Sequence, residues 1–274
     1  MTVQAQSLQT ESRQEYTLQI LAHEPLVAHV SANIFIKDGH LFTGEGGADQ
    51  FPRHWAVFVK NLQVRDGLEH LLPISEVTNK DSEKGEWSVG DAYSGPAQIT
   101  YDVDLGFTKT KWDPSNEKAG YFDGKALYLV TKMLFLASVT DKPAELRIVV
   151  PSGYKVATPW NALEAGDEHT FVAPTTFDLQ QNSIVVGDFG AHEVRQGNFP
   201  FTVALLGKLK ESGAIAASTM AVFARHYAQM FPSTLPLVIC SLREWGIFRA
   251  QRRLRDGSAT HPRKSDSLRK YSRS

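Results

Sequence analysis

The histidines are the first residues to test for chemistry, because the chain of 274 residues contains nine of them. A helical zinc site needs His-Glu-x-x-His, in which two histidines four residues apart reach one metal ion. The nearest match, His192-Glu193-Val194-Arg195-Gln196, ends in glutamine, and Gly190 and Gly197 beside it disfavour a helix. His23-Glu24-Pro25 also lacks a second histidine. The sequence therefore predicts no metal ligand, and zinc is not expected in this chain.

Motifs for other kinds of catalysis are also missing from the sequence. No Gly-x-Ser-x-Gly elbow is present for a serine nucleophile, and no glycine pattern opens a nucleotide-binding helix. The cluster Gly44-Glu45-Gly46-Gly47 precedes Pro52 and an expected strand, so we interpret it as a loop. Asp102 and Asp104 could act as an acid–base pair, but two carboxylates on the solvent-exposed face of a strand need no catalytic role. The expected set of catalytic, cofactor-binding and metal residues is therefore empty.

Aromatic side chains could form a carbohydrate-binding platform, but most of them fall within expected strands, where core packing explains them. Tyr121 and Phe122, beside Gly120 and Gly124, are the exceptions and are expected in a loop. The aromatic residues considered are Trp55, Phe58, Tyr101, Phe107, Tyr121, Phe122, Tyr128 and Trp160. The single Cys240 excludes a disulfide framework and is expected to be a small buried apolar residue.

The charge is unevenly distributed, although the formal net charge is only −1. Residues 241–274 contain ten Lys or Arg and three Asp or Glu, so this end carries +7 and the rest −8. Nucleic-acid binding is not expected, because few aromatic residues accompany the basic ones.

No apolar run approaches the length of a membrane span, and no secretory signal opens the sequence. We therefore expect a cytoplasmic protein without membrane contact.

Period-two hydrophobicity dominates the first 190 residues and predicts a mainly β fold. Residues 99–107 place Ile99, Tyr101, Val103 and Leu105 at every second position, which is typical of a strand with one buried face. Similar segments occur at residues 16–20, 28–36, 55–64, 126–130, 146–150, 169–172 and 183–186. Many short strands at nearly regular spacing indicate an antiparallel β-sandwich. Gly120 to Lys125 is expected to be a turn.

The pattern changes near residue 200 and predicts a partial α/β segment. The sequence predicts a buried strand at residues 201–206, a helix at residues 211–230 and another strand at residues 235–240. The helix is expected to bury Val222, Phe223 and Tyr227 on one face. The expected organisation is a disordered N-terminus (1–14), a sandwich (15–190), the start of a second domain (191–240) and a basic, disordered tail (241–274).

The order of these segments resembles the front part of the glycyl aminopeptidase family of zinc peptidases, from about Tyr16 to Ile239. Tyr154 stands where the family usually has tryptophan. The segments that carry the resemblance are Tyr121-Phe122-Asp123-Gly124-Lys125-Ala126-Leu127-Tyr128-Leu129, Ile148-Val149-Val150-Pro151-Ser152-Gly153-Tyr154-Lys155-Val156-Ala157-Thr158, Thr176-Phe177-Asp178-Leu179, Ser183-Ile184-Val185-Val186-Gly187-Asp188-Phe189, Phe231-Pro232 and Leu235-Pro236-Leu237-Val238.

The resemblance implies an N-terminal β-sandwich, a thermolysin-like zinc domain and usually a PDZ-like domain. The family's His-Glu-x-x-His helix would follow Val238, where this chain has residues 242–274 instead, so no catalytic or metal residue of the family maps here. We expect a peptidase-family protein or fragment with the substrate-framing domain and no active centre. The alternative is a non-catalytic sandwich that binds peptide or glycan. Expected partners are a peptide or protein, and a second copy through residues 200–240.

Overall fold

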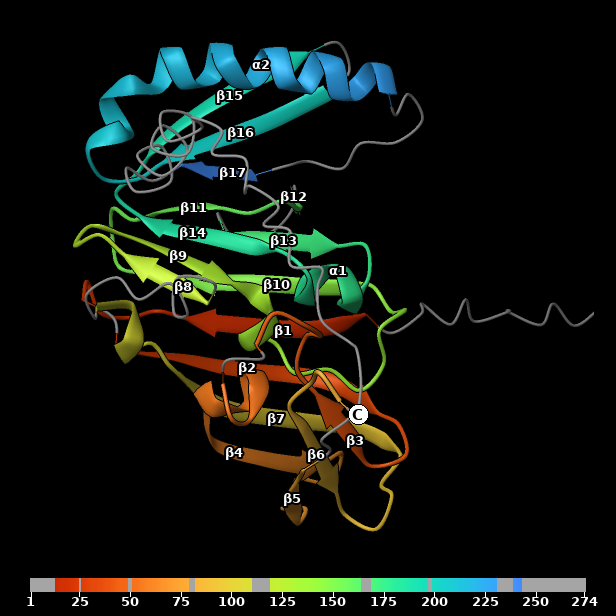
Figure 1. Cartoon of the computed structure of the whole chain (residues 1–274). Coiled ribbons are helices and arrows are strands. Elements are labelled where there is room, and N and C mark those ends of the chain that lie inside the picture. Colours follow the sequence, from red (N-terminus) through yellow and green to blue (C-terminus); the bar gives the residue numbers. More distant parts are fainter. Residues whose placement is uncertain are drawn as a thin grey trace, which may run out of the picture.

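The computed structural model describes residues 13–24, 26–48, 51–78, 82–109, 119–163, 169–196, 199–230 and 239–242. Strands dominate, as the sequence predicted, and they form one large and three small sheets (Figure 1). The large sheet faces two of the small ones, and the third small sheet carries the long helix α2. The sequence placed residue 14 in a disordered N-terminus and residues 241 and 242 in a disordered tail. In the structure Gln14 belongs to the first strand, and Ser241 and Leu242 belong to the last.

The seven-stranded sheet has the order β12-β13-β10-β1-β2-β7-β4. Its pairs are antiparallel, as the sequence predicted, except β1 with β10, which is parallel. The bounds of its strands are β1 Gln14–Gln19, β2 Val27–Ile36, β4 Val59–Asp66, β7 Gly95–Asp104, β10 Ala144–Val149, β12 Asn161–Ala162 and β13 Thr170–Ala173. The burial of β2 and β7 alternates strictly, and this alternation produces one apolar and one polar face.

Two smaller sheets cover the apolar face of the large one. Leu129 and Ile184 from one, and Trp87 and Val89 from the other, join its inward residues in a single core. The first sheet contains β11 Lys155–Ala157, β14 Ser183–Gly187, β9 Ala126–Val130 and β8 Gly120–Phe122 in that order. The second contains β3 His40–Phe42, β6 Glu86–Val89 and β5 Ile74–Val77.

A segment that belongs to none of the sheets, residues 131–136, begins as a 3-10 helix and crosses this core with Met133, Leu134 and Phe135 fully buried. Buried backbone groups need partners, and here side chains supply them. The hydroxyl of Tyr101 donates to the Leu134 carbonyl at 2.7 Å and accepts the Leu136 N–H at 3.0 Å. The Tyr16 hydroxyl and the Gln180 amide reach the carbonyls of Leu136 and Phe135 in the same way. Polar side chains thus provide the hydrogen bonds that this buried segment does not receive from a neighbouring strand.

The third small sheet contains β15 Gly190–Gln196, β16 Phe199–Leu205 and β17 Ile239–Leu242, and β16 pairs with β17 in parallel. Strand β16 is buried on both faces. Val203 and Leu205 contact α2, Gly213–Met230, whereas Ala204 packs with Val185 against the four-stranded sheet. The β15–β16 layer therefore lies between α2 and the sandwich (Figure 1). No helix in the described part of the chain has the length and apolarity needed to cross a membrane.

Helix α2 buries a different face from the one the sequence predicted. Ala216 and Met220 pack on the sheet, whereas the side chains of Val222 and Phe223 are 48% and 64% exposed. Small residues at positions 213, 216, 217 and 221 allow the helix to lie close to β15 and β16. His192 lies directly over Gly213, where no larger residue would fit. Close packing of small residues thus outweighs burial of the larger apolar ones.

Three local expectations were also wrong. Residues 55–58 belong to the 3-10 helix η1, His54–Phe58, because consecutive rather than alternate side chains are buried there. Strand β7 ends at Asp104, and Phe107 lies in the 3-10 helix η2, Gly106–Lys109. The expected turn from Gly120 begins as strand β8, and the tight turn comes only at Gly124. The remaining short helices are η4 Thr131–Met133, α1 Thr176–Gln180 and η5 Gly207–Ser212.

Candidate functional site

The polar face of the seven-stranded sheet carries the candidate site, because both surface hollows described below lie on it. Strand register places outward side chains in three transverse rows across β1, β2, β7 and β4. The first row contains Glu15, Asn33, Gln98 and Arg65, the second Thr17, Ser31, Thr100 and Gln63, and the third Gln19, His29, Asp102 and Lys60. Amide, hydroxyl and charged groups are therefore spaced regularly over the sheet.

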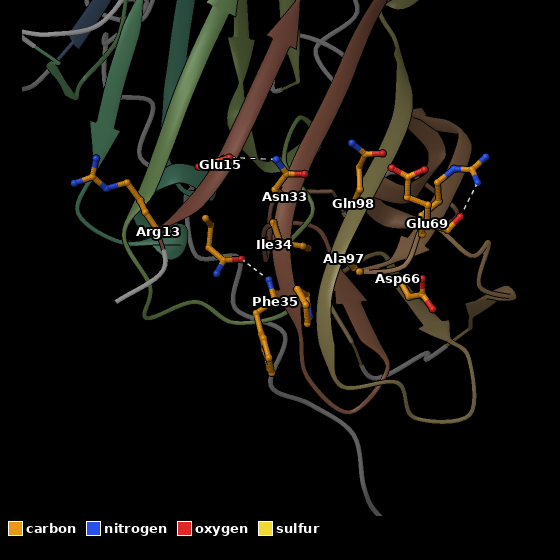
Figure 2. Close-up of a pocket in the computed structure, with 13 residues that line it drawn as sticks. Arg13, Glu15, Asn33, Ile34, Phe35, Asp66, Glu69, Ala97 and Gln98 are labelled. Atoms are coloured by element: carbon orange, nitrogen blue, oxygen red, sulfur yellow. Dashed lines mark hydrogen bonds between the residues drawn. The ribbon is translucent and has the colours of Figure 1, made fainter. Parts of the chain in front are cut away.

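The larger hollow, which we call the end groove, has a volume of about 390 Å³. It lies over the first row, where β2 ends and β7 begins, beside the loop that follows β4 (Figure 2). Its polar lining includes Arg13, Glu15, Asn33, Gln98 and Arg65. Its apolar lining is Ile34, Phe35, Pro96 and Ala97. A hollow with a few convergent polar groups and an apolar part is the usual form of a small-ligand site.

Hydrogen bonds hold part of the end groove in place. The Asn33 amide donates to Glu15 at 3.1 Å, and the Arg65 guanidinium donates to the Glu69 carbonyl at 3.0 Å (Figure 2). Gln14, although buried, uses its side-chain oxygen to accept the Phe35 N–H at 2.9 Å. This contact fixes the end of β2 just beyond its pairing with β1. Side chains from β1, β2, β7 and β4 therefore line the groove, and hydrogen bonds order several of them.

The second hollow, of about 220 Å³, lies over the second and third rows, and Asp102 is one of its lining residues. Its carboxylate is 2.5 Å from His29 Nδ1 and accepts a hydrogen bond from the Asn61 amide at 2.7 Å. Partial burial alone would raise the pKa of Asp102, but the hydrogen bonds from Asn61 and His29 and the nearby His29 ring outweigh it and lower that pKa. Asn61 has φ of +53° at the irregularity between Lys60 and Gln63. This left-handed backbone is one that asparagine tolerates, and it turns the amide toward Asp102.

These groups are suited to binding polar ligands. A histidine oriented by a carboxylate is half of a nucleophile-activating arrangement, but nothing encloses it on this open face. Across the described ranges, no three His, Cys, Asp or Glu side chains come close enough together to hold a metal ion. Ser31 and Thr100 occupy the middle row, and no hydrogen bond to either side chain is found within the described residues. The face therefore presents donors and acceptors for recognition.

The residues weighed from the sequence are scattered over the molecule. His192 lies on strand β15 and not on a helix, and the His23 carbonyl accepts a hydrogen bond from Tyr154 at 2.9 Å. Asp102 and Asp104 both point outward from β7, as the alternation predicted, and Asp102 lines the second hollow. Tyr121 and Phe122 lie in β8 and are half-buried. Cys240 lies in β17.

Sequence reasoning did not find the end groove or the cluster around Asp102. His29 and Asn61 are 73 and 41 residues away from Asp102 in the chain, so no local spacing connects them. The one available signal was the outward register of adjacent strands, which needs the pairing of β2 with β7 to be known.

The sandwich and the α2 unit, residues 190–230, meet at a polar junction. The Asp123 carboxylate accepts the N–H groups of Lys125 and Ala126 within its own hairpin and the N–H of Gly207 at 2.6 Å. Asp188 forms an ion pair with Lys210. Hydrogen bonding to Lys210 is the largest influence on Asp188 and lowers its pKa. These contacts, with the apolar cluster around Val185, attach the α2 unit to the sandwich.

Comparison with known proteins gives one family and several related folds. The family model of the peptidase M61 N-terminal domain matches residues 51–188, half of the chain. An aminopeptidase N family protein from Idiomarina loihiensis is 18% identical, with a TM-score of 0.61, over 83% of this chain and 38% of that chain. A variant of the M1 zinc metallopeptidase from Deinococcus radiodurans, solved with the peptide Tyr-Ser-Ala, is 12% identical, with a TM-score of 0.50, over 85% of this chain and 57% of that one.

At these identities the two solved structures are evidence of a shared fold alone. The chain spans less than two thirds of the length of either one. No curated protein matches the sequence.

Proposed function

The chain belongs to the family of the peptidase M61 N-terminal domain, and from this premise we propose that its sandwich frames the substrate of a zinc aminopeptidase of the glycyl type. The proposal rests chiefly on the family match over residues 51–188. The motifs from Tyr121 to Leu129 and from Ile148 to Thr158, which resemble the glycyl aminopeptidases, fall within that match. Its expected partner is therefore a peptide with a free amino terminus.

The junction supports the same proposal. A framing domain must hold a fixed position relative to the domain that performs the chemistry. Here strand β14 runs into β15 through only Asp188 and Phe189, and the Asp123 and Asp188 contacts attach the α2 unit to the sandwich. In our proposal, β15, β16 and α2 are the beginning of the catalytic domain.

We further propose that this chain supplies no active centre of its own. A catalytic zinc ion needs three protein ligands and an open position for water. The sequence offers no His-Glu-x-x-His. Elemental analysis of the purified chain should show less than stoichiometric zinc, and glycyl p-nitroanilide should stay intact with or without added Zn²⁺. One tightly bound zinc per chain together with hydrolysis would overturn this part of the proposal.

Framing can be tested by complementation. A zinc-binding domain from a glycyl aminopeptidase, produced without its own N-terminal domain, is assayed on glycyl and N-acetylglycyl peptides. Adding the chain should raise kcat/KM for the glycyl peptide at least tenfold, and the Asp123→Ala variant, which loses the contact to Gly207, should raise it less. If the two proteins associate and the rate does not change, the framing role is wrong.

The cytoplasmic location stays a prediction from the N-terminal sequence.

A further inference from the structure

We propose that the end groove is a binding site for a neutral saccharide, with Phe35 and Pro96 as the platform for one sugar ring. This site lies on the outer face of the seven-stranded sheet, away from the α2 unit, and does not depend on the peptidase assignment.

The platform is an apolar patch on an otherwise polar face. Phe35 and Pro96 lie directly opposite each other on β2 and β7, and the Phe35 side chain is 44% exposed. Figure 2 shows the Phe35 side chain at the edge of the groove, beyond Asn33 and Ile34 on the same strand. The C–H face of a sugar ring packs well against an aromatic ring, whose face carries negative partial charge. Phe35 therefore offers a surface that a hydroxylated ring can cover.

The row next to the platform matches sugar hydroxyls, each of which both donates and accepts. Asn33 uses one amide hydrogen on Glu15 and keeps its other donor and its acceptor for a ligand. No hydrogen bond to the Gln98 amide is found within the described residues, so this side chain also offers a donor and an acceptor. Glu15 accepts and Arg65 donates at the two ends of the row. Each class of group is therefore present in the row beside Phe35, within two strands of it.

The charges of the groove favour a neutral ligand. The lining of the groove contains two arginines, Arg13 and Arg65, and three acidic residues, Glu15, Asp66 and Glu69, so charges of both signs are present. Arg13 forms an ion pair with Glu145 at 3.1 Å, and the Asp66 carboxylate accepts the N–H groups of Leu68 and His70. A phosphate or ammonium ligand would require a cluster of unpaired charges of the opposite sign. The ion pair of Arg13 and the hydrogen bonds of Asp66 leave no such cluster among these groups. A saccharide requires none.

The position of the groove argues against an extended peptide. Peptides commonly join a sheet at an open edge, where unpaired main-chain groups are available. Strands β2 and β7 are central, and their ladder is complete from Val27 with Asp104 to Ile36 with Gly95. Only side chains are offered here. The polar rows continue from Phe35 to His29 over about 20 Å of strand, enough for a short oligosaccharide.

The test is a titration of the full chain with neutral oligosaccharides. Cello-, xylo-, malto- and chito-tetraoses are added to ¹⁵N-labelled protein, and binding is followed by NMR and calorimetry. At least one sugar should bind saturably at millimolar concentration or below and shift the backbone signals of Asn33, Phe35 and Gln98. The Phe35→Ala variant should bind at least tenfold more weakly, the Gln98→Ala variant several-fold more weakly, and the Phe35→Tyr variant normally.

Phe177, which lies on α1 and is 51% exposed, provides the matched control. Phe177→Ala removes the same ring from another surface and should leave sugar binding unchanged. Thermal melting of each variant shows whether it is folded. The proposal is overturned if no tetraose binds up to 5 mM, if Phe35→Ala binds as well as the parent, or if only peptides or phosphorylated sugars shift the groove signals.

Discussion

Tyr101 shows how one side chain can stabilise a core segment that belongs to none of the sheets. Its hydroxyl donates to the Leu134 carbonyl and accepts the Leu136 N–H, and burial raises its pKa well above the ordinary value. The group therefore stays neutral and keeps both roles over the pH range in which the protein is handled.

We expect Tyr101→Phe to lower the free energy of unfolding by about 1–3 kcal/mol, because it leaves a buried carbonyl and a buried N–H without partners. Urea denaturation measures the change. Tyr154→Phe is the control, since the Tyr154 hydroxyl makes its bond to the His23 carbonyl near the surface. If the two variants lose equal stability, residues 131–136 do not depend on Tyr101.

The carboxylate of Asp102 provides a pH test of the second hollow. Replacing Asn61 with glycine removes a hydrogen bond while keeping the left-handed backbone, which glycine also adopts. The pKa of Asp102 should rise toward its ordinary value, because the His29 interactions alone offset burial less well. NMR titration of the side-chain carboxyl carbon measures this shift directly.

The sign of the stability effect follows from the same shift. A lowered pKa in the folded state adds stability above the unfolded pKa, and that stability is lost as the pH falls through the folded value. Asn61→Gly should therefore reduce the stability that Asp102 contributes near neutral pH and should matter little in strong acid. An unchanged pKa of Asp102 in the variant would mean that Asn61 is not its main partner.

At the scale of elements, helix α2 presents an uncovered apolar face. Ile215, Val222 and Phe223 are 73%, 48% and 64% exposed, and no charged residue lies between Gly213 and Ala224. Two copies of this face could pack together as an antiparallel helix pair without charge repulsion. We therefore keep the prediction that the chain associates with itself through this region.

The test of this prediction is light scattering over a range of concentrations. The full chain should dimerise or aggregate, whereas the Phe223→Lys variant should stay monomeric. Ala214→Lys, also at an exposed position of α2, serves as a control for added charge at the end of the face. A monomeric full chain at all concentrations would refute the prediction.

The strands could be located from the sequence much more reliably than the surfaces they build. Alternation identified β2 and β7, because burial of one face leaves a period of two in the chain. The buried face of α2 was assigned wrongly, because the sequence shows large apolar residues but not how closely Ala216 and Met220 approach the sheet. The Asp102 cluster joins three strands, and such pairing is not encoded locally.

At the scale of the whole molecule, the main core unites the seven-stranded sheet with two smaller sheets. Val103, near the C-terminal end of β7, is fully buried. Val103→Asp should lower the free energy of unfolding by several kcal/mol, because it places a carboxylate in an apolar interior. The outward substitution Thr100→Asp on the same strand should cost far less. Equal melting of the two variants would contradict the burial of Val103.

The two-sided burial of the four-stranded sheet also has a consequence for synthesis on the ribosome. Every strand of the seven-stranded sheet has left the ribosome once Ala173 has emerged. Ala126 and Val185, on the outer face of the four-stranded sheet, are covered only after Ala204 and Leu206 have been synthesised. At typical elongation rates the delay after Val185 is roughly 1–4 s. During that interval the nascent chain carries a completed sandwich with an uncovered apolar side, to which a chaperone or a neighbouring nascent chain has access.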